Sequence, residues 1–360
     1  MNYDDLLQLE PYGVPADEKR AVLESLLNDL TDRHSSLCQP YGRACRLLGD
    51  VPGSRRSLEE IPMVPVSVFK QTDLSSIPEE EIFKVMTSSG TTGQRPSKII
   101  LDEKTAAWQQ QTLERIVSSF IGEKRLPMLI IDAPNVLRDR NLFSARGAGI
   151  LGFSIFGRKR KYALNEQMEL DEEGVRRFLE EADGGPVLVF GFTYLIWKYY
   201  YQVLKQRGSR LPLDNGYMIH GGGWKKMQNE AVSTEQFRAG LNEVCGIGNV
   251  WNYYGMAEQT GCIYMECECG HLHASTYSDI LIRNMEDFSC CKNGTEGVVQ
   301  VLTPMAWSYP GHSILTEDKG IILGEDDCPC GRKGKYFKIT GRIPKAEIRG
   351  CSDTYENGER

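Results

Sequence analysis

Residues 185–208 read GPVLVFGFTYLIWKYYYQVLKQRG, a short apolar run followed directly by a longer aromatic segment. The run 185–192 is typical of a buried β-strand, and residues 193–208 are typical of a helix that ends at Gly208. We interpret the helix aromatics Trp197, Tyr200 and Tyr201 as core residues. Strands that alternate with helices indicate an α/β fold with a largely parallel sheet.

The same alternation continues on both sides of this stretch. The strand-like PMLIIDAP (127–134) and the helical EEGVRRFLEEAD (172–183) precede it. GYMIHGGG (216–223), a helix opened by a capping pattern from Ser233 to Gln236, and VWNYYGMAEQTG (250–261) follow it. The alternation predicts an α/β core of mostly parallel strands.

The flanking regions have different patterns. Residues 15–36 form an amphipathic helical pattern with a stripe of leucines at Leu23, Leu26, Leu27 and Leu30. Beyond residue 262 short strand-like runs and turns indicate a small antiparallel subdomain. We therefore expect four segments: a helical lead-in at 1–84, an α/β core at 85–261, a β-rich subdomain at 262–340 and a hinge-like tail at 341–360.

Composition limits the function classes. The 360 residues carry a formal net charge of −7 and are 41% hydrophobic, which is ordinary for a globular enzyme. We find no basic stripe typical of nucleic-acid binding, no secretory signal and no apolar run long enough to span a bilayer. We expect a cytoplasmic protein with no nucleic-acid partner and no membrane span.

The stretch VMTSSGTTGQRPSKIILD (85–102) combines glycines with small hydroxyl side chains. Glycine allows backbone amides to face an anion, and serine and threonine hydroxyls donate beside them, so a phosphate chain is a suitable ligand. The common phosphate loop has lysine directly after its second glycine, whereas Gln94 follows Gly93 here. A flexible surface loop is the alternative interpretation.

Five blocks in order resemble the adenylate-forming superfamily, and within it the acyl-protein synthetases of the LuxE type, which are related to the phenylacetate-CoA ligases. The blocks are TSSGTTGQRPSK, HGGGWKKM, NYYGMAEQTG, SYPGHSILTEDKG and KITGRIPKAEIRG, and the resemblance covers residues 61–355. It implies the large-domain fold of that superfamily, with the carboxy-terminal mobile domain truncated or absent.

The resemblance implies that a carboxylate attacks the α-phosphate of ATP and that a thiol then accepts the acyl group. Oriented amides and hydroxyls would stabilise the charge on the leaving pyrophosphate. The residues implied to bind ATP are Thr87, Ser88, Ser89, Gly90, Thr91, Thr92, Gly93, Lys98, Gly221, Gly222, Gly223, Tyr254, Gly255, Asp318 and Arg342.

The resemblance also implies roles beside the nucleotide. Glu258 would hold Mg²⁺, a cation that prefers hard oxygen ligands, although Ala257 stands where the family commonly has threonine. His220 would polarise the acyl carboxylate, with a structural histidine as the alternative. Residues where a strand turns into a helix would line the acyl pocket: Phe190, Gly191, Phe192 and Tyr194.

Two cysteine-rich turns, ECECGHLH (266–273) and DDCPCGRKG (326–334), carry soft metal ligands. Two such turns can supply the four ligands of a tetrahedral structural Zn²⁺. We favour Cys267, His273, Cys328 and Cys330, with Cys269 or His271 as substitutes. Reduced buried thiols are the alternative.

In the acyl-protein synthetases a cysteine near the end of the chain accepts the acyl group, and Cys351 matches it. The resemblance therefore implies an acid–thiol ligase that loads a fatty acid on Cys351 and delivers it to a partner acyl reductase, as in bioluminescence. One alternative is transfer to coenzyme A or a carrier protein, and another is a nucleotide-binding scaffold without catalysis. An inert tail cysteine is the alternative for Cys351.

Overall fold

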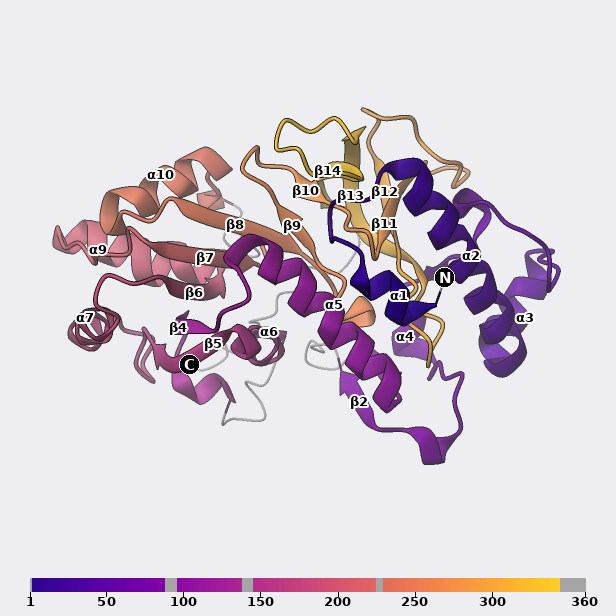
Figure 1. The fold of residues 1–360 in the computed structure, drawn as a ribbon, viewed down its shortest axis with the longest axis horizontal. Coiled ribbons are helices and arrows are strands. Elements are labelled where there is room, and N and C mark those ends of the chain that lie inside the picture. The colour runs from indigo at the N-terminus through magenta and orange to yellow at the C-terminus, as the bar shows by residue number, and fades with distance from the viewer. Residues whose placement is uncertain (1, 88–95, 138–144, 225–228, 344–360) are drawn as a thin grey trace. The chain divides into compact units, whose positions relative to one another are not determined.

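The computed structural model describes residues 2–87, 96–137, 145–224 and 229–343 (Figure 1). The described residues of Ile121–Tyr254 form one compact unit, which we call the parallel unit. Those of Met1–Phe120 and Gly255–Ala346 form a second one, which we call the antiparallel unit. The division into four segments expected from the sequence stays a prediction.

The parallel unit contains five strands that pair only in parallel, in the spatial order β5, β4, β6, β7, β8. Their bounds are β4 Leu126–Ile131, β5 Gly157–Tyr162, β6 Val187–Phe192, β7 Gly216–Gly221 and β8 Asn249–Tyr254. Every residue of β4 and β6 is buried, as expected of strands covered on both faces. The predicted α/β class with a parallel sheet is confirmed.

Helices cover both faces of this sheet. Phe153 of α6 (Ala145–Phe153) stacks on Phe190 of β6, with ring centroids 4.5 Å apart. Phe237 of α10 (Thr234–Cys245) lies against His220 of β7. His220 pairs with Gly191 of β6, so α10 covers the face of the sheet opposite to that of Phe190. Helix α7 (Glu172–Glu181) precedes β6.

The predicted helix after β6 is one continuous run. It comprises α8 (Thr193–Leu195), a π-helical stretch Ile196–Tyr201 and α9 (Gln202–Arg207), and it ends at Gly208 with φ +60°. Its aromatics are buried, with exposed fractions of 8%, 0% and 7% at Trp197, Tyr200 and Tyr201. Their interpretation as core is confirmed. The Ser233–Gln236 capping pattern is also confirmed, because both of its hydrogen bonds form at the start of α10.

The antiparallel unit is built on strands from the last third of the described chain. Strands β11, β12, β13, β14, β10 and β9 follow one another in antiparallel pairs, and β1 pairs in parallel with β13. Their bounds are β1 Val64–Pro65, β9 Tyr264–Glu266, β10 Leu272–His273, β11 Asp279–Arg283, β12 Gly297–Leu302, β13 Ser313–Glu325 and β14 Lys335–Arg342. The antiparallel arrangement predicted beyond residue 262 is confirmed.

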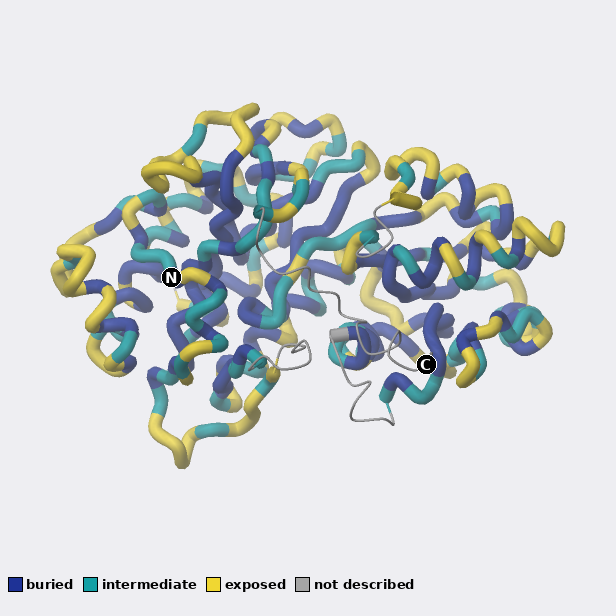
Figure 2. The backbone as a smooth tube through the Cα atoms, turned by 180° about the vertical axis from the view of Figure 1, so that it is seen from behind, coloured by how far each residue is buried: buried dark blue, intermediate teal, exposed yellow. Residues whose placement is uncertain are grey.

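Helices from the first third of the chain complete this unit. They are α1 (Tyr3–Gln8), α2 (Ala16–Leu37), α3 (Gln39–Leu47), α4 (Val68–Gln71) and α5 (Glu103–Ile121). The predicted leucine stripe lies on α2, where Leu23, Leu27 and Leu30 pack in one buried cluster with Leu281 and Leu302. In Figure 2 the buried, dark blue backbone follows the strands, and yellow marks the exposed turns and outer faces of helices.

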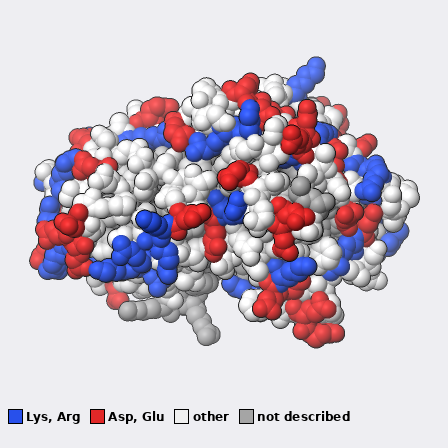
Figure 3. All heavy atoms as spheres, viewed as in Figure 1, with Lys and Arg blue, Asp and Glu red and all other residues white. Residues whose placement is uncertain are grey.

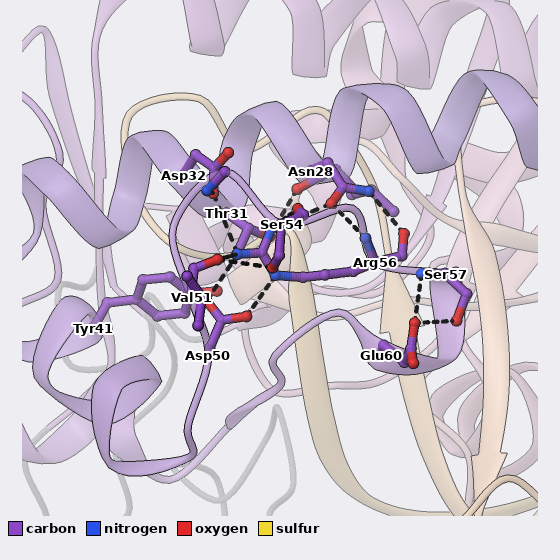
Figure 4. A network of polar contacts seen from close by, with 12 residues as sticks. Asn28, Thr31, Asp32, Tyr41, Asp50, Val51, Ser54, Arg56, Ser57 and Glu60 are labelled. Carbon is purple, nitrogen blue, oxygen red and sulfur yellow. Dashed lines mark hydrogen bonds and ion pairs between the residues drawn. The ribbon is translucent and has the colours of Figure 1, made fainter.

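The loop after α3 is held by one buried guanidinium. Arg56 donates to the carboxylates of Asp50 and Asp32 and to the carbonyl oxygens of Val51 and Ser54, and its own backbone N–H donates to Asn28 of α2 (Figure 4). The planar guanidinium has five N–H donors, which suits it to join a loop to a helix in this way. This network fixes residues 50–56 against α2.

No helix in the described part of the chain combines the length and the apolar character needed to cross a bilayer.

Candidate functional site

The candidate residues divide between the two units. His220, the glycines 221–223, Tyr254 and the acyl-pocket candidates belong to the parallel unit. The other described candidates belong to the antiparallel unit, and the chain passes from one unit to the other between Tyr254 and Gly255. Residues 88–93 of the Gly/Thr loop and Cys351 lie outside the described residues.

In the parallel unit the strands end together at one edge of the sheet. The chain builds β4 and β5 on one side and then β6, β7 and β8 on the other, so the strand order reverses between β4 and β6. Open parallel sheets bind ligands outside the carboxyl ends of the strands at such a reversal. Phe192, Gly221 and Tyr254 end their strands at this edge.

His220 is buried at this edge and is bonded to the start of the neighbouring helix. The Thr193 hydroxyl donates to the carbonyl oxygen of Gly221 at 3.1 Å, and Thr193 Oγ1 lies 2.9 Å from His220 Nδ1. Because the single hydroxyl proton is used, Nδ1–H donates to Thr193, and Nε2 keeps its lone pair. Burial, with a smaller effect of Arg238, lowers the pKa of His220 to about 3, so the imidazole is neutral.

The glycine run after His220 has a packing reason as well as a conformational one. A Cβ on Gly221 would lie 2.6 Å from Cε1 of Tyr253, so the aromatic ring of β8 occupies the space that a side chain would need. Gly222 and Gly223 have φ angles of +79° and +63°, in the region that favours glycine. The backbone of Gly222 and Gly223 is exposed, as close contact with a ligand requires, whereas Gly221 is buried beneath the Tyr253 ring.

Three of the acyl-pocket candidates lie on two faces of β6, and the fourth, Tyr194, follows in α8. The rings of Phe190 and Phe192 share one face, where Phe153 and Tyr253 pack beside them. Gly191 lies on the other face, which is also the face of His220. The structure therefore brings the two phenylalanines together but separates them from His220 by the sheet.

In the antiparallel unit the ends of the Gly/Thr loop are held side by side. Strands β2 (Lys84–Thr87) and β3 (Lys98–Leu101) form an antiparallel pair in which Thr87 is opposite Lys98. Lys98 Nζ lies 3.0 Å from a carboxylate oxygen of Asp73, and both side chains are partly exposed. The predicted cation is thus present at the loop's end, in an ion pair that is open to solvent.

Glu258 lies in a short turn, Ala257–Gln259, that is fixed by buried contacts. The carbonyl oxygen of Glu258 accepts a hydrogen bond from the Tyr309 hydroxyl at 2.8 Å, and the Gln259 amide donates to carbonyl oxygens of Val301 and Gly311. The turn ends at Gly261, where φ is +89° and a Cβ would lie 2.1 Å from a carbonyl oxygen of α5. Glu258 itself is 5% exposed.

Asp318 and Arg342 are brought together by strand register. They are direct partners on β13 and β14, and Arg342 Nε donates to the Asp318 carboxylate at 3.1 Å. The second neighbour of this guanidinium is Glu317, at 3.3 Å. These partly exposed side chains form a carboxylate–guanidinium group that suits the hydroxyls and phosphates of a nucleotide.

The two cysteine-rich turns also meet in the antiparallel unit. One ligand atom from each of Cys267, His273, Cys328 and Cys330 lies within 4.8 Å of all the others. The Cys267 and Cys328 sulfurs are 3.9 Å apart, and Cys330 Sγ is 3.4 Å from His273 Nε2. A tetrahedral zinc with its usual bond lengths separates its ligands by about 3.5–3.8 Å.

The donor chemistry also fits a dication. Burial lowers the pKa of His273 to about 4, so its imidazole is neutral, and burial raises the pKa of Cys267 to about 11. A bound cation would supply the positive charge that stabilises thiolates at this site. Of the substitutes, His271 lies 3.3 Å from the Cys328 sulfur outside the four-residue group, and Cys269 is exposed.

Several residues around the candidates were not predicted. Thr193 orients His220, Tyr253 covers Gly221, and Tyr336 stacks on the rings of both His271 and His273. Asp132, just after β4, is buried in an ion pair with Arg146 at the strand-order reversal. An acid that directly follows an apolar strand is a sequence signal for a residue at this edge, and PMLIID contains it.

The fold is that of the adenylate-forming ligases. A crystal structure of 2-hydroxyisobutyryl-CoA ligase in an open conformation, in complex with 2-HIB-AMP and CoA, matches with a TM-score of 0.70 over 94% of this chain and 78% of that chain, at 18% identity. A structure of the same enzyme in the postadenylation state matches with a TM-score of 0.67 over 92% and 70%, also at 18% identity.

Within this class, the chain belongs to the LuxE acyl-protein synthetase family, because the family model described as "Acyl-protein synthetase, LuxE" matches residues 2–358. Its relatives include two proteins named long-chain-fatty-acid–luciferin-component ligase, each 22% identical. The one from Vibrio harveyi aligns over 97% of this chain and 91% of its own length, and the one from Aliivibrio fischeri over 98% and 93%. A third, from Photorhabdus luminescens, is 35% identical over 25% of this chain and 78% of its own length.

Proposed function

We propose that this protein is an ATP-dependent ligase that activates a long-chain fatty acid and loads it on its own Cys351. The observation that carries the proposal is the match to the acyl-protein synthetase family over residues 2–358. The carboxylate oxygen attacks the α-phosphorus, pyrophosphate leaves, and an acyl-adenylate forms. The Cys351 thiolate then attacks the acyl carbon and expels AMP to give a thioester, with the thiol proton released to solvent.

The described residues support the first step. In the antiparallel unit, the Asp318–Arg342 group provides acceptors for ribose hydroxyls and a fork for phosphate. Thr87 and Lys98 lead into and out of the Gly/Thr loop, whose amides and hydroxyls would bind the leaving pyrophosphate. In the parallel unit the glycine backbone at 221–223, which is exposed at Gly222 and Gly223, and the Tyr254 ring would bind the adenosine.

Neutral His220 has a narrower role than that of a cation. With Nδ1–H bonded to Thr193, Nε2 is a hydrogen-bond acceptor without positive charge, so His220 would lie beside the acid but would not polarise its carboxylate. The apolar face formed by Phe190 and Phe192 would contact the acyl chain. Tyr194, in the helix that follows β6, would border the acid, and Gly191 would do so from the His220 face of the sheet.

Two metals belong to this proposal. Glu258 would hold Mg²⁺, which neutralises phosphate charge during the transfer. Cys267, His273, Cys328 and Cys330 would hold Zn²⁺ in a closed structural site that takes no part in the chemistry. A partner acyl reductase would receive the thioester, in keeping with the luciferin-component relatives.

The test is the intact mass of the protein after incubation with ATP, Mg²⁺ and a panel of fatty acids. We expect an acyl adduct that hydroxylamine removes and that peptide mapping places on Cys351. Cys351→Ser should lose the adduct and keep acid-dependent pyrophosphate release. Cys290→Ser, which changes an exposed cysteine, is the matched control and should keep both.

The other outcomes are equally informative. An adduct on a different cysteine would show that the acceptor is wrong while the ligase assignment holds. Absence of pyrophosphate release with every acid would contradict the ligase itself and favour a nucleotide-binding scaffold. If the carboxylate binds ribose, Asp318→Asn should lower kcat/KM for ATP in pyrophosphate release at least about tenfold.

The second candidate is an acid–CoA or acid–carrier-protein ligase. The fold shared with 2-hydroxyisobutyryl-CoA ligase favours it. Acyl-CoA formation by Cys351→Ser at the rate of the unchanged protein would establish this candidate.

A further inference from the structure

The amino-terminal edge of the parallel sheet carries a depression that none of the roles above uses. Its volume is about 340 Å³, at the small end of the range for ligand pockets. Four cations line it, Lys124 and Arg125 before β4 and Arg158 and Lys159 of β5. The four cations are exposed, and Figure 3 shows blue side chains gathered over this β4–β5 end of the unit.

A β-bulge explains how neighbouring residues reach one depression. Successive side chains of a regular strand point to opposite faces. The pairing of β4 with β5 moves from Pro127–Arg158 to Leu129–Lys161, so β5 has one extra residue at this point. Bulges redirect side chains, and here Arg158 and Lys159 both line the depression. Lys159 has a φ of +47°, which is uncommon for a residue other than glycine.

The two arginines are fixed by backbone rather than by acids. Arg158 Nε donates to the carbonyl oxygen of Arg125 at 3.1 Å, and Arg125 donates to the carbonyl oxygen of Gly157. Each guanidinium keeps further N–H donors for a ligand, in an orientation that is already set. Such preorganisation lowers the entropic cost of binding.

Positive charge is in excess at this site. Within the described part of the chain, Lys124, Arg125, Arg158 and Lys159 form no ion pair, whereas Lys161 on the same strand is paired with Asp171. Glu181 is the one acid in the lining. Four cations around one depression repel one another, and a bound anion would relieve that repulsion. The protein as a whole is negative, with a net charge of −7, so this local excess is against its overall sign.

Part of the lining of the depression, which we call its floor, is apolar. It comprises Leu126, Pro127, Phe178 and Pro186. Charged edge strands also discourage pairing with other chains, and β5 is at the sheet's edge. That role needs neither a depression nor arginines anchored to the backbone beside an apolar floor.

We propose that this depression is a second anion site, which binds a compact ligand combining two or more phosphoryl groups with a planar body, the chemistry of a nucleoside diphosphate. The phosphoryl groups contact the guanidinium and ammonium groups, and the planar body lies on the floor beside Phe178. The proposal is independent of the fatty-acid ligase activity. It predicts that a nucleotide binds at the amino-terminal edge of the sheet, away from the carboxyl ends of the strands.

The test measures binding of ADP and of inorganic pyrophosphate, without metal and at low salt, by calorimetry on the full chain. Hydrogen exchange locates the site through peptides that cover residues 122–131 and 157–165. The test variant is Lys124→Gln with Lys159→Gly, because glycine accepts the φ of residue 159 and the fold is retained. The control is Arg177→Gln with Arg207→Gln, which removes two charges from acid-paired arginines of the same unit.

We expect ADP to protect these peptides and to bind more tightly than pyrophosphate. Its affinity should fall as salt is added. The test variant should bind at least about tenfold more weakly at this site, and the control should bind unchanged. Protection that is equal in the test variant and the unchanged protein would overturn the proposal. The proposal would also be overturned if neither ADP nor pyrophosphate protected these peptides. A polyglutamate peptide is a third probe, and protection by it alone would indicate an acidic protein partner instead.

Discussion

The strands of the two units are buried by different means. In the parallel unit, β4 and β6 are wholly buried and contain no charged side chain. In the antiparallel unit, β11 is equally buried yet begins with Asp279 and ends with Arg283. The difference teaches that the central strands of the parallel unit depend on apolar packing, whereas the antiparallel unit also buries polar groups that satisfy one another.

The polar groups of the antiparallel unit form chains across strands. Arg283 donates to Gln300 at 2.6 Å, and Gln300 donates to Ser313 at 2.9 Å. Asp279 accepts from Lys335 at 2.9 Å and lies 3.7 Å from Lys19 Nζ of α2. Buried charges of this kind are costly to leave unpaired. Removal of a single partner should therefore damage this unit more than an apolar truncation of equal size.

The largest effect should come from the four-ligand metal group. If Zn²⁺ occupies it, Cys328→Ser or a strong chelator should destabilise the antiparallel unit by at least about 5 kcal/mol, because structural zinc contributes of order 10 kcal/mol in small domains. Elemental analysis should find about one zinc per chain. Cys269→Ser, outside the group, is the matched control. If the protein without zinc were equally stable, metal binding would not contribute to the stability of the antiparallel unit.

Asp279→Asn should cost about 3–5 kcal/mol of the free energy of unfolding, because two buried ammonium groups lose their carboxylate. Urea denaturation measures it. The triple change Lys19→Met, Asp279→Leu and Lys335→Met should recover most of the loss, since well-packed apolar residues can replace a buried ionic group. If the single variant loses less than about 1 kcal/mol, the antiparallel unit does not depend on this network.

Gly221→Ala tests the close packing of the parallel unit. Its Cβ would lie 2.6 Å from the Tyr253 ring, so we expect a loss of about 1–3 kcal/mol in denaturant unfolding. Gly248→Ala meets no atom within 4 Å and should change stability by less than about 0.5 kcal/mol. In a double-mutant cycle, Tyr253→Ala should remove most of the penalty at Gly221.

The smallest effect concerns pH and compares one histidine from each unit. Burial lowers the pKa of both His312 and His220 from 6.5 to about 3. As the pH falls from 6.5 to 5.5 the unfolded chain binds a proton that the folded chain does not, so each histidine should reduce stability by about 1 kcal/mol over that unit. Above pH 6.5 neither contributes. Unfolding of His312→Phe and His220→Phe at pH 6.5 and 5.5 should show a smaller drop than the unchanged protein, and an equal drop would contradict the buried neutral state.

The parallel unit was largely predictable from the sequence. Apolar runs such as 127–134 and 185–192 indicate buried parallel strands when helical segments separate them. The Ser233–Gln236 cap marks the start of α10. Strand β5 was not predicted, because GRKRKY contains no apolar alternation and acquires its strand from pairing with β4. Local pattern does not indicate pairing at an edge.

The antiparallel unit shows where local pattern ends. The spacing of the cysteine-rich turns predicted which four side chains would meet, because few geometries suit so many soft ligands. The burial of Lys19 was not predictable, since its partner Asp279 is far along the chain. Thr193 and Tyr253 likewise act through neighbouring strands, so their contacts with His220 and Gly221 depend on tertiary structure.

The antiparallel unit is discontinuous, and this has a consequence during synthesis on the ribosome. The leucines of α2 are made early, but their cluster also contains Leu302. At about 5–20 residues per second, roughly 15–50 s pass between the two ends of that cluster. The described residues of the parallel unit, Ile121–Tyr254, are all made before then. The leucines of α2 can contact Leu58 and Ile61 early. The part of their face that packs on Leu281 and Leu302 stays uncovered while the later half is translated, and we expect chaperones to bind the nascent protein in that interval.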